Sequence, residues 1–247
     1  MADGRHMAVF WIRLAEKIIR IDSIYEYVAQ MCEPYLCEPA RPDIRVVCTE
    51  ADIAYERSGV KSEEVYRDDY LESLAVYRQI AEQMTMYSTF LMHGAVAAVN
   101  GEAYMFTAAS GVGKTTRLKG WLEQIEDSSV VNGDKPLLKV TDREILACGT
   151  PWCGKENLHT NTVVPLRAII LLERGEKEKL RKITFSEAFV KLLEQIYRPK
   201  KPDAMVQTLR LIKALDGRVQ FFRYSSCLED MDLRRVYEQA GPKKSAG

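Results

Sequence analysis

The chain has 247 residues, of which 47% are hydrophobic and 28% are charged, and its 35 basic residues balance its 35 acidic residues. This length is enough for a sizeable core, in one large domain or two small ones. The zero net charge gives no electrostatic reason to expect a nucleic acid or an anionic membrane surface as a partner. No apolar run approaches the about 20 residues that a transmembrane helix needs.

We divide the chain by its composition and pattern. Residues 1–6 are expected to be a leader added before the native start at Met7, and residues 241–247 a disordered tail. Residues 7–87 are expected to form an N-terminal portion of strands and helices, and residues 88–240 a core. The absence of a low-complexity linker predicts one compact domain overall, and a homo-oligomer is left open.

The N-terminal apolar run is too short for a secretion signal, so we expect a cytoplasmic protein with reduced cysteines. Two pairs of the six cysteines, Cys32 with Cys37 and Cys148 with Cys153, are separated by four residues, which is the upper limit for paired zinc ligands. Ordinary half-buried thiols are the interpretation that we favour.

The N-terminal portion alternates between strand and helix patterns. Residues 8–22 indicate two strands of a hairpin-like unit, and residues 44–48 indicate another strand. Apolar residues at intervals of three to four then predict a helix of about four turns over residues 70–84. Glu72 is expected on the charged, solvent-facing side of this helix.

The most informative stretch runs from Ala108 to Thr116 and matches the Walker A pattern G-x-x-x-x-G-K-[ST], with Ala108 in place of the first glycine. An apolar run precedes it and a helical pattern follows it, as the motif requires. Glycines let the backbone approach phosphate closely, and the N–H groups and the helix N-terminus attract its charge. The residues expected to contact a bound nucleotide are Ser110, Gly111, Val112, Gly113, Lys114, Thr115 and Thr116.

Two residues of this loop have distinct expected roles. Lys114 can reach the β- and γ-phosphates, and the hydroxyl of Thr115 can ligate Mg²⁺. The expected ligands are therefore ATP and Mg²⁺, with GTP left open as the nucleotide.

A hairpin places a histidine beside the loop. Two apolar runs, residues 95–99 and 103–107, flank Asn100-Gly101, the strongest short signal for a type I′ turn. The second run leads into the phosphate loop, and His93 precedes the first. Because both runs have five residues, we expect His93 to be a neighbour of the phosphate loop.

An acid and an irregular segment follow the loop helix. Residues 129–132 indicate a short strand that leads to Asp134, twenty residues after the Walker lysine, where phosphoryl transfer needs an acid. Residues 149–161 are irregular and contain Trp152 and Lys155. This segment is either a tight loop that Trp152 anchors or a substrate loop in which Lys155 points at substrate phosphate.

The remaining pattern completes the expected core. Residues 137–148 indicate a second hairpin, residues 166–172 are the most hydrophobic strand, and Thr184-x-x-Glu187 is a capping box that opens a helix. A last helix is expected over residues 228–238. The hairpins upstream of the phosphate loop argue against a doubly wound βαβ fold, so we predict an α/β chain, tending to α+β, with a mixed β-sheet and peripheral helices.

Three segments together resemble the HPr kinase/phosphorylase group, whose phosphate-loop domain is related to phosphoenolpyruvate carboxykinase, and the small HPr-kinase-like proteins of bacteria: Met92-His93-Gly94-Ala95, Ser110-Gly111-Val112-Gly113-Lys114-Thr115 and Asn132-Gly133-Asp134. The resemblance implies the mixed-sheet fold of that group. It also implies that His93 orients or polarises Asp134, which takes a proton from an acceptor hydroxyl or holds Mg²⁺ together with Thr115. Family members with two adjacent acids divide these roles, whereas this chain has Lys135 in the second position.

Two classes of function follow as hypotheses. The first is an ATP-dependent kinase that acts on a Ser or Thr hydroxyl of a protein or of a ribosomally made peptide, with Lys114, His93 and Asp134 as catalytic residues; a small-molecule alcohol is an alternative acceptor. The second is a regulatory or accessory module that binds ATP without transferring phosphate. Lys135, in place of a second acid, is the best support for the second class.

Overall fold

The computed structural model describes residues 7–60, 65–226 and 231–241. The chain divides into two compact units, Met1–Thr85 and Met86–Gly247, whereas we expected one compact domain overall. The boundary lies two residues before the end of the N-terminal portion that the sequence indicated. The expected leader, residues 1–6, and the expected tail beyond residue 241 lie outside the described residues.

The N-terminal unit combines a three-stranded sheet with helices. Its sheet has the order β1-β2-β3, with β1 antiparallel to β2 and β2 parallel to β3. The hairpin, the next strand and the long helix that the sequence predicted are all confirmed. The bounds are β1 Ala8–Leu14, β2 Lys17–Ser23, α1 Glu26–Met31, η1 Glu33–Tyr35, β3 Ile44–Val47, α2 Glu50–Ser58 and α3 Asp68–Met84, and η2 (Thr85–Tyr87) spans the boundary between the units.

The prediction for Glu72 is wrong, because this residue of α3 is fully buried. Its carboxylate accepts hydrogen bonds from the backbone N–H groups of Ile24 and Tyr25, which precede α1. Glu72 therefore satisfies two N–H groups of the segment that leads into α1, a helix that has no side-chain cap hydrogen bond. Burial raises the pKa of Glu72 even though these two hydrogen bonds act to lower it.

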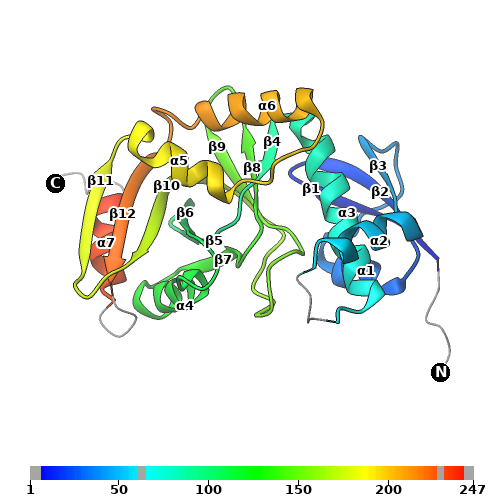
Figure 1. Cartoon of the computed structure of the whole chain (residues 1–247). Coiled ribbons are helices and arrows are strands. Elements are labelled where there is room, and N and C mark those ends of the chain that lie inside the picture. Colours follow the sequence, from blue (N-terminus) through cyan, green and yellow to red (C-terminus); the bar gives the residue numbers. More distant parts are fainter. Residues whose placement is uncertain (1–6, 61–64, 227–230, 242–247) are drawn as a thin grey trace. The chain divides into compact units, whose positions relative to one another are not determined.

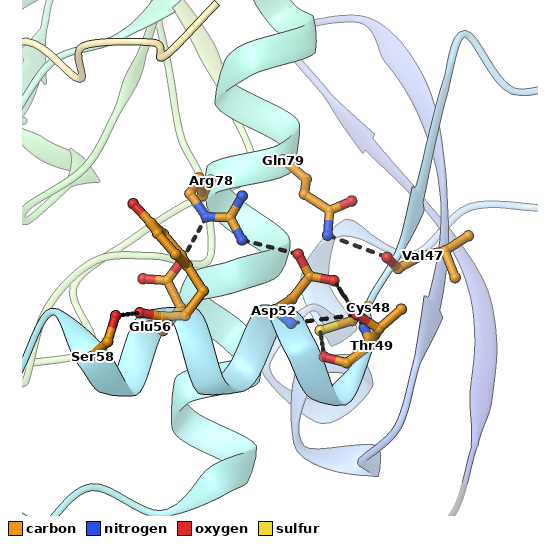
Figure 2. Close-up of polar contacts among 9 residues, drawn as sticks. Val47, Cys48, Thr49, Asp52, Glu56, Ser58, Arg78 and Gln79 are labelled. Atoms are coloured by element: carbon orange, nitrogen blue, oxygen red, sulfur yellow. Dashed lines mark hydrogen bonds and ion pairs between the residues drawn. The ribbon is translucent and has the colours of Figure 1, made fainter.

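Arg78 joins α3 to α2 through two carboxylates (Figure 2). Its Nε donates to Oε1 of Glu56 at 2.6 Å, and its Nη2 donates to Oδ1 of Asp52 at 3.1 Å. The guanidinium also lies over the ring of Tyr55, 4.8 Å from its centroid. All three charged side chains are no more than 24% exposed, so this cluster is better shielded from water than a surface ion pair.

Two glutamines of α3 bind carbonyl groups of the edge strand β3. The amide nitrogen of Gln79 donates to the carbonyl of Val47 (Figure 2), and that of Gln83 donates to the carbonyl of Arg45, each at 3.2 Å. The two glutamines are four residues apart on the helix and the two carbonyl groups belong to residues two apart on the strand, and these spacings correspond to similar distances along the two elements. These bonds occupy hydrogen-bonding groups that an open strand edge would offer to another chain.

The C-terminal unit is built on one mixed sheet of nine strands. Seven strands follow the order β4-β8-β9-β10-β6-β5-β7, while β12 pairs with β10 and β11 with β12. The pairs β6–β10 and β10–β12 are parallel and the other pairs are antiparallel, so the mixed sheet that the sequence predicted is confirmed. The bounds are β4 Thr89–Leu91, β5 Ala95–Val99, β6 Glu102–Thr107, β7 Ser129–Asn132, β8 Leu137–Val140, β9 Ile145–Cys148, β10 Val163–Arg174, β11 Lys179–Ile183 and β12 Gln220–Ser226.

Helices cover both faces of the central strands (Figure 1). Alternate residues of β6 enter two separate cores: Met105 packs in the core shared with α5 and α6, whereas Phe106 packs in the core shared with α4 and α7. The strand is therefore buried on both sides, which explains the continuous apolar and aromatic run at residues 103–106. The bounds are α4 Lys114–Gln124, α5 Phe185–Gln195, α6 Pro202–Lys213 and α7 Leu233–Ala240.

Several local predictions for this unit are confirmed. Asn100 and Gly101 both have positive φ, 52° and 75°, as a type I′ turn requires, and they join β5 to β6. The capping box of α5 is present, with reciprocal bonds between Thr184 and Glu187. The start expected for the last helix falls on residues 228–230, outside the described part of the chain. Among the described residues, none of the helices has the length and apolar character needed to cross a membrane.

We predict that Arg78→Met destabilises the N-terminal unit by about 1–3 kcal/mol, because two shielded carboxylates lose their cation. Hydrogen exchange of α2 and α3 amides in the full chain measures this loss. Arg45→Met is the matched control, since Arg45 pairs with Asp22 but is 59% exposed, and it should cost less than about 1 kcal/mol. Equal effects of the two substitutions would contradict a structural role for the Arg78 cluster.

Candidate functional site

The phosphate loop joins β6 to α4, as the sequence predicted. Gly111 and Gly113 have φ values of 78° and 96°, in the left-handed region that favours glycine. Gly113 is the N-cap of α4, and no atom lies within 4 Å of the position that a Cβ on Gly111 would occupy. The loop therefore presents backbone with open space in front of it at the positive end of a helix dipole, which is an arrangement suited to an anion.

Lys114 is the buried cation of this loop, with only 7% of its surface exposed. Its Nζ donates to the carbonyls of Ala108 and Ala109, at 3.0 Å and 3.3 Å. Burial lowers the pKa of Lys114, and the charge of Asp134 partly offsets this. A buried ammonium group that is held only by neutral carbonyls is poorly compensated, so an anion in front of the loop would be favourable.

Two arginines hold the loop backbone from behind and from the side. Nη1 of the buried Arg117 donates to the carbonyl of Val112 at 2.7 Å. Nη2 of Arg174, at the end of β10, donates to the carbonyl of Gly111 at 3.0 Å. These contacts bind two carbonyl groups of the loop and so restrict its backbone.

His93 and Asp134 meet beside the loop. Nε2 of His93 lies 2.9 Å from Oδ1 of Asp134. The hydroxyl of Thr107, the last residue of β6, donates to the carbonyl of His93 at 2.7 Å. The prediction that His93 is a neighbour of the phosphate loop is therefore confirmed, and the hairpin register that suggested it is the physical reason.

Gln195, which the sequence analysis missed, holds His93 from its other side. Its backbone carbonyl accepts from the N–H of His93 at 2.7 Å, and its side-chain Oε1 lies 3.3 Å from Nδ1. The Asp134 carboxylate can only accept, so Nε2 carries a proton. A side-chain amide has one donor group and one acceptor atom. Rotation of the Gln195 amide by 180° therefore lets it accept from a protonated Nδ1 or donate to an unprotonated one. The two residues are 102 positions apart, and no local pattern relates them.

Asp134 is held in its ionised form. Burial acts to raise the pKa of this carboxyl, but the hydrogen bond from His93 and the positive charges of Lys135, His93 and Lys114 outweigh burial and place the pKa below its ordinary value. Nζ of Lys135 lies 3.8 Å from Oδ2 of Asp134. A carboxyl with a lowered pKa stabilises the fold above its unfolded-state pKa, and that contribution is lost as the pH falls through the lowered value.

The turn that carries Asp134 is fixed by a buried asparagine. Oδ1 of Asn132 accepts from the N–H groups of Asp134 and Lys135, at 2.8 Å and 2.7 Å. Its Nδ2 donates to the carbonyl of Thr150 at 2.9 Å, and both Asn132 and Thr150 are fully buried. Asn132 is therefore a positioning residue, although the sequence indicated it only as a neighbour of the acid.

The irregular segment, residues 149–161, packs against this turn. A Cβ on Gly154 would lie 3.2 Å from Cβ of Asp134, and one on Gly133 would lie 2.8 Å from the carbonyl of Cys153. Trp152 is 4% exposed, so it anchors the segment inside the unit, and Lys155 is exposed. The burial of Trp152 agrees with the interpretation of this segment as a tight loop that Trp152 anchors. Among the described residues, no hydrogen bond or ion pair joins Lys155 to the other site residues.

Two hollows lie at opposite ends of the parallel strands. The larger, about 500 Å³, includes Glu102, the first residue of β6, and Arg167, within the N-terminal half of β10. The smaller, about 260 Å³, includes Ala108 and Ala109 of the phosphate loop together with Gln195. The smaller hollow adjoins the candidate site, whereas none of the predicted site residues lines the larger one.

The cysteines are more buried than expected. Cys32, Cys48, Cys148 and Cys153 are buried free thiols, Cys37 is partly exposed, and Cys227 lies outside the described residues. Burial raises the pKa of Cys153 to about 11, so its sulfur stays protonated and is a poor metal ligand. Within the described ranges, no group of three or more His, Cys, Asp and Glu side chains is arranged to hold a metal ion.

No protein-family model matches the chain, and no curated protein matches it. The function must therefore be argued from the chemistry of the site. The site combines a glycine-containing loop at a helix N-terminus, a buried ammonium group and a carboxylate bonded to an imidazole, all within one unit.

We predict that Gln195→Met changes the environment of Nδ1 of His93, because methionine has a similar length but neither end of an amide. Nitrogen-15 NMR of the imidazole groups measures this change, and the chain has only three histidines. His159 is the internal control, since its ring should be unaffected. An unchanged His93 spectrum would show that the 3.3 Å contact carries no hydrogen bond.

Proposed function

We propose that this chain is an ATP-dependent kinase of the HPr kinase/phosphoenolpyruvate carboxykinase fold type, acting in the cytoplasm. It transfers the γ-phosphoryl group to a Ser or Thr hydroxyl of a protein or peptide, including a ribosomally made precursor. The observation that carries the proposal is the 2.9 Å contact between His93 and Asp134 beside the phosphate loop. An anion site next to a carboxylate and an imidazole is the combination that phosphoryl transfer to an alcohol needs.

The residues of the loop fit a nucleoside triphosphate. Gly111 has open space in front of its backbone. Lys114 is a buried cation, and its two hydrogen-bond acceptors are both neutral carbonyl groups. Thr115, at the second position of α4, and Asp134 are the residues that would hold Mg²⁺. When bound, the metal ion would neutralise charge on the phosphates.

The proposed step is an in-line displacement. The hydroxyl oxygen of the acceptor attacks the γ-phosphorus, the bond from that phosphorus to the bridging oxygen breaks, and ADP leaves. Lys114 stabilises negative charge on the phosphates. The hydroxyl proton passes to Asp134. The hydrogen bond from His93 fixes the orientation of this carboxylate and stabilises its charge.

The lowered pKa of Asp134 bears on which role it plays. A carboxylate with a low pKa is a weak base, so it accepts the proton late, after the bond to the leaving group has loosened. A loose transition state makes little demand on the base. The same ionised carboxylate also suits a metal ligand, and both roles remain within the proposal.

A second function has a specific observation in its favour. Lys135 occupies the position next to Asp134 and pairs with it at 3.8 Å. An ammonium group at this place can neutralise the acid and take the position of a second metal-binding carboxylate. A module that binds ATP without transferring phosphate is therefore the alternative.

We predict that Lys114→Ala weakens binding of MgATP about 10- to 100-fold, since one charge-assisted hydrogen bond contributes about 1.5–3 kcal/mol. Isothermal calorimetry measures the affinity. Lys119→Ala is the matched control, because Lys119 lies on the same helix, is exposed and pairs with Glu156. Equal affinities of the Lys114 variant and the parent would remove the basis of the nucleotide site.

We predict that the wild-type chain transfers labelled phosphate from ATP to a Ser- or Thr-containing peptide pool faster than to water. Small alcohols are tested beside the peptides. Transfer only to a small alcohol would retain the kinase and exclude the peptide. Tight ATP binding without any transfer would support the accessory module.

In the same assay, His93→Asn and Asp134→Asn should each reduce kcat, and the double variant should lose less than the sum of the two effects in ΔΔG‡. Residues that act as one unit show such non-additivity. Strict additivity would mean that their contact has no part in the reaction.

A further inference from the structure

The hollow of about 260 Å³ beside the phosphate loop has not been given a role above. Its position is set by the pairing of Leu171 in β10 with Thr107 in β6, which brings the end of β10 next to the loop. Helix α5 closes the other side with Lys191, Glu194 and Gln195. The hollow is therefore enclosed by three segments that are far apart in sequence.

The hollow adjoins the reactive end of the proposed site. The carbonyls of Ala108 and Ala109, which line it, are the two acceptors of the Lys114 ammonium group. Gln195, which also lines it, touches one edge of the His93 ring, and Asp134 touches the other edge. Gln195 and the imidazole ring of His93 thus lie between the hollow and the carboxylate that receives the acceptor's proton.

The size of the hollow favours part of an acceptor over a whole ligand. A volume of 260 Å³ is equivalent to roughly nine water molecules and lies below the about 300–1,000 Å³ of pockets that hold complete small molecules. A nucleoside would also belong at the other end of a triphosphate chain, away from the γ-phosphate. We conclude that the hollow suits one side chain of the same molecule that carries the acceptor hydroxyl.

The lining determines the chemistry of that side chain. The buried residues Leu171 and Ala108 contribute apolar lining. The charged lining residues include two neutralised pairs, Lys191 with Glu194 and Glu173 with Arg223, and also Arg174, whose guanidinium donates to the carbonyl of Gly111. An aliphatic group gains from burial there, whereas a charged group would lose much of its hydration.

We infer that this hollow seats an aliphatic side chain one or two residues from the acceptor Ser or Thr of an extended peptide. The inference rests on the proposed kinase function and names its substrate class. The imidazole ring with its contacts of 3.3 Å and 2.9 Å spans roughly 8 Å, whereas two residues of extended chain advance about 6.6 Å, so the reach of the side chains supplies the remainder. The hydroxyl then lies at Asp134 while its aliphatic neighbour lies against Leu171.

The first experiment uses a library of blocked peptides with one central serine and with Leu, Asp or Lys at the two positions on each side. Phosphate transfer from ATP is measured for each. We expect Leu at one of these positions to raise kcat/KM over Asp by about tenfold or more, as burial of one leucine side chain implies. Equal rates for Leu and Asp at all four positions would overturn the inference.

The second experiment fills the hollow from its exposed mouth. Glu194→Trp and, separately, Lys191→Trp should each raise the KM for the Leu-containing peptide about tenfold or more, with kcat and the MgATP affinity little changed. Val190→Trp is the matched control, because Val190 lies on the same helix, is 63% exposed and does not line the hollow.

The outcomes separate this inference from the proposed function. If the wild-type chain transfers phosphate but the Glu194 and Lys191 variants behave like the Val190 control, the kinase stands and the assignment of the hollow falls. If those variants weaken MgATP binding instead, the hollow belongs to the nucleotide. If the wild-type chain transfers to nothing, the proposed function fails in the wild-type arm itself, and the inference fails with it.

Discussion

The antiparallel register between β5 and β6 is the constraint on which the candidate site depends. Ala95 pairs with Phe106, so the residue two positions before β5 lies beside the end of β6, where the phosphate loop begins. Asn100 and Gly101 fix this register because both adopt positive φ in a two-residue turn. A one-residue slip would reverse the faces of the strand and would move apolar side chains from one core into the other. The same pairing that buries both faces of β6 therefore positions His93.

Asp134 is positioned by a different means, since it lies in a turn and not in the sheet. Asn132 satisfies two N–H groups of that turn, and its amide is itself bound to a buried threonine. Gly133 and Gly154 let the irregular segment approach the turn more closely than a Cβ would allow. The rigid sheet thus holds the imidazole, while a network of buried polar groups holds the carboxylate. Such networks specify geometry well only when each member is satisfied, as it is at Asn132.

Signals within about ten residues predicted much of this fold, whereas contacts between distant segments were missed. The Asn-Gly turn, the Walker loop and the capping box at Thr184 each have a local physical cause, and the structure contains all three. Glu72 was expected in solvent because its helix face is charged, yet it binds the N–H groups of Ile24 and Tyr25, 47 or more residues away. Gln195 had no local signal either, because it is only the last residue of an amphipathic helix. The division into two units depends on the density of long-range contacts, which composition does not reveal.

The charged groups around Asp134 determine how readily its carboxylate accepts a proton. Burial acts to raise its pKa, but the hydrogen bond from His93 and the nearby ammonium groups of Lys135 and Lys114 lower it below its ordinary value. A site that is rich in positive charge before any phosphate arrives favours binding of the anion, and each phosphate oxygen then competes with Asp134 for the same cations. Bound phosphate would thereby weaken the hold of Lys114 and Lys135 on the carboxylate and raise its basicity. His93 would remain as the partner that keeps its orientation, because its ring is fixed on the other edge by Gln195. In this arrangement the nucleotide itself would prepare the acid to accept a proton, which explains how a carboxylate of low pKa in the free protein can serve as a base in the complex.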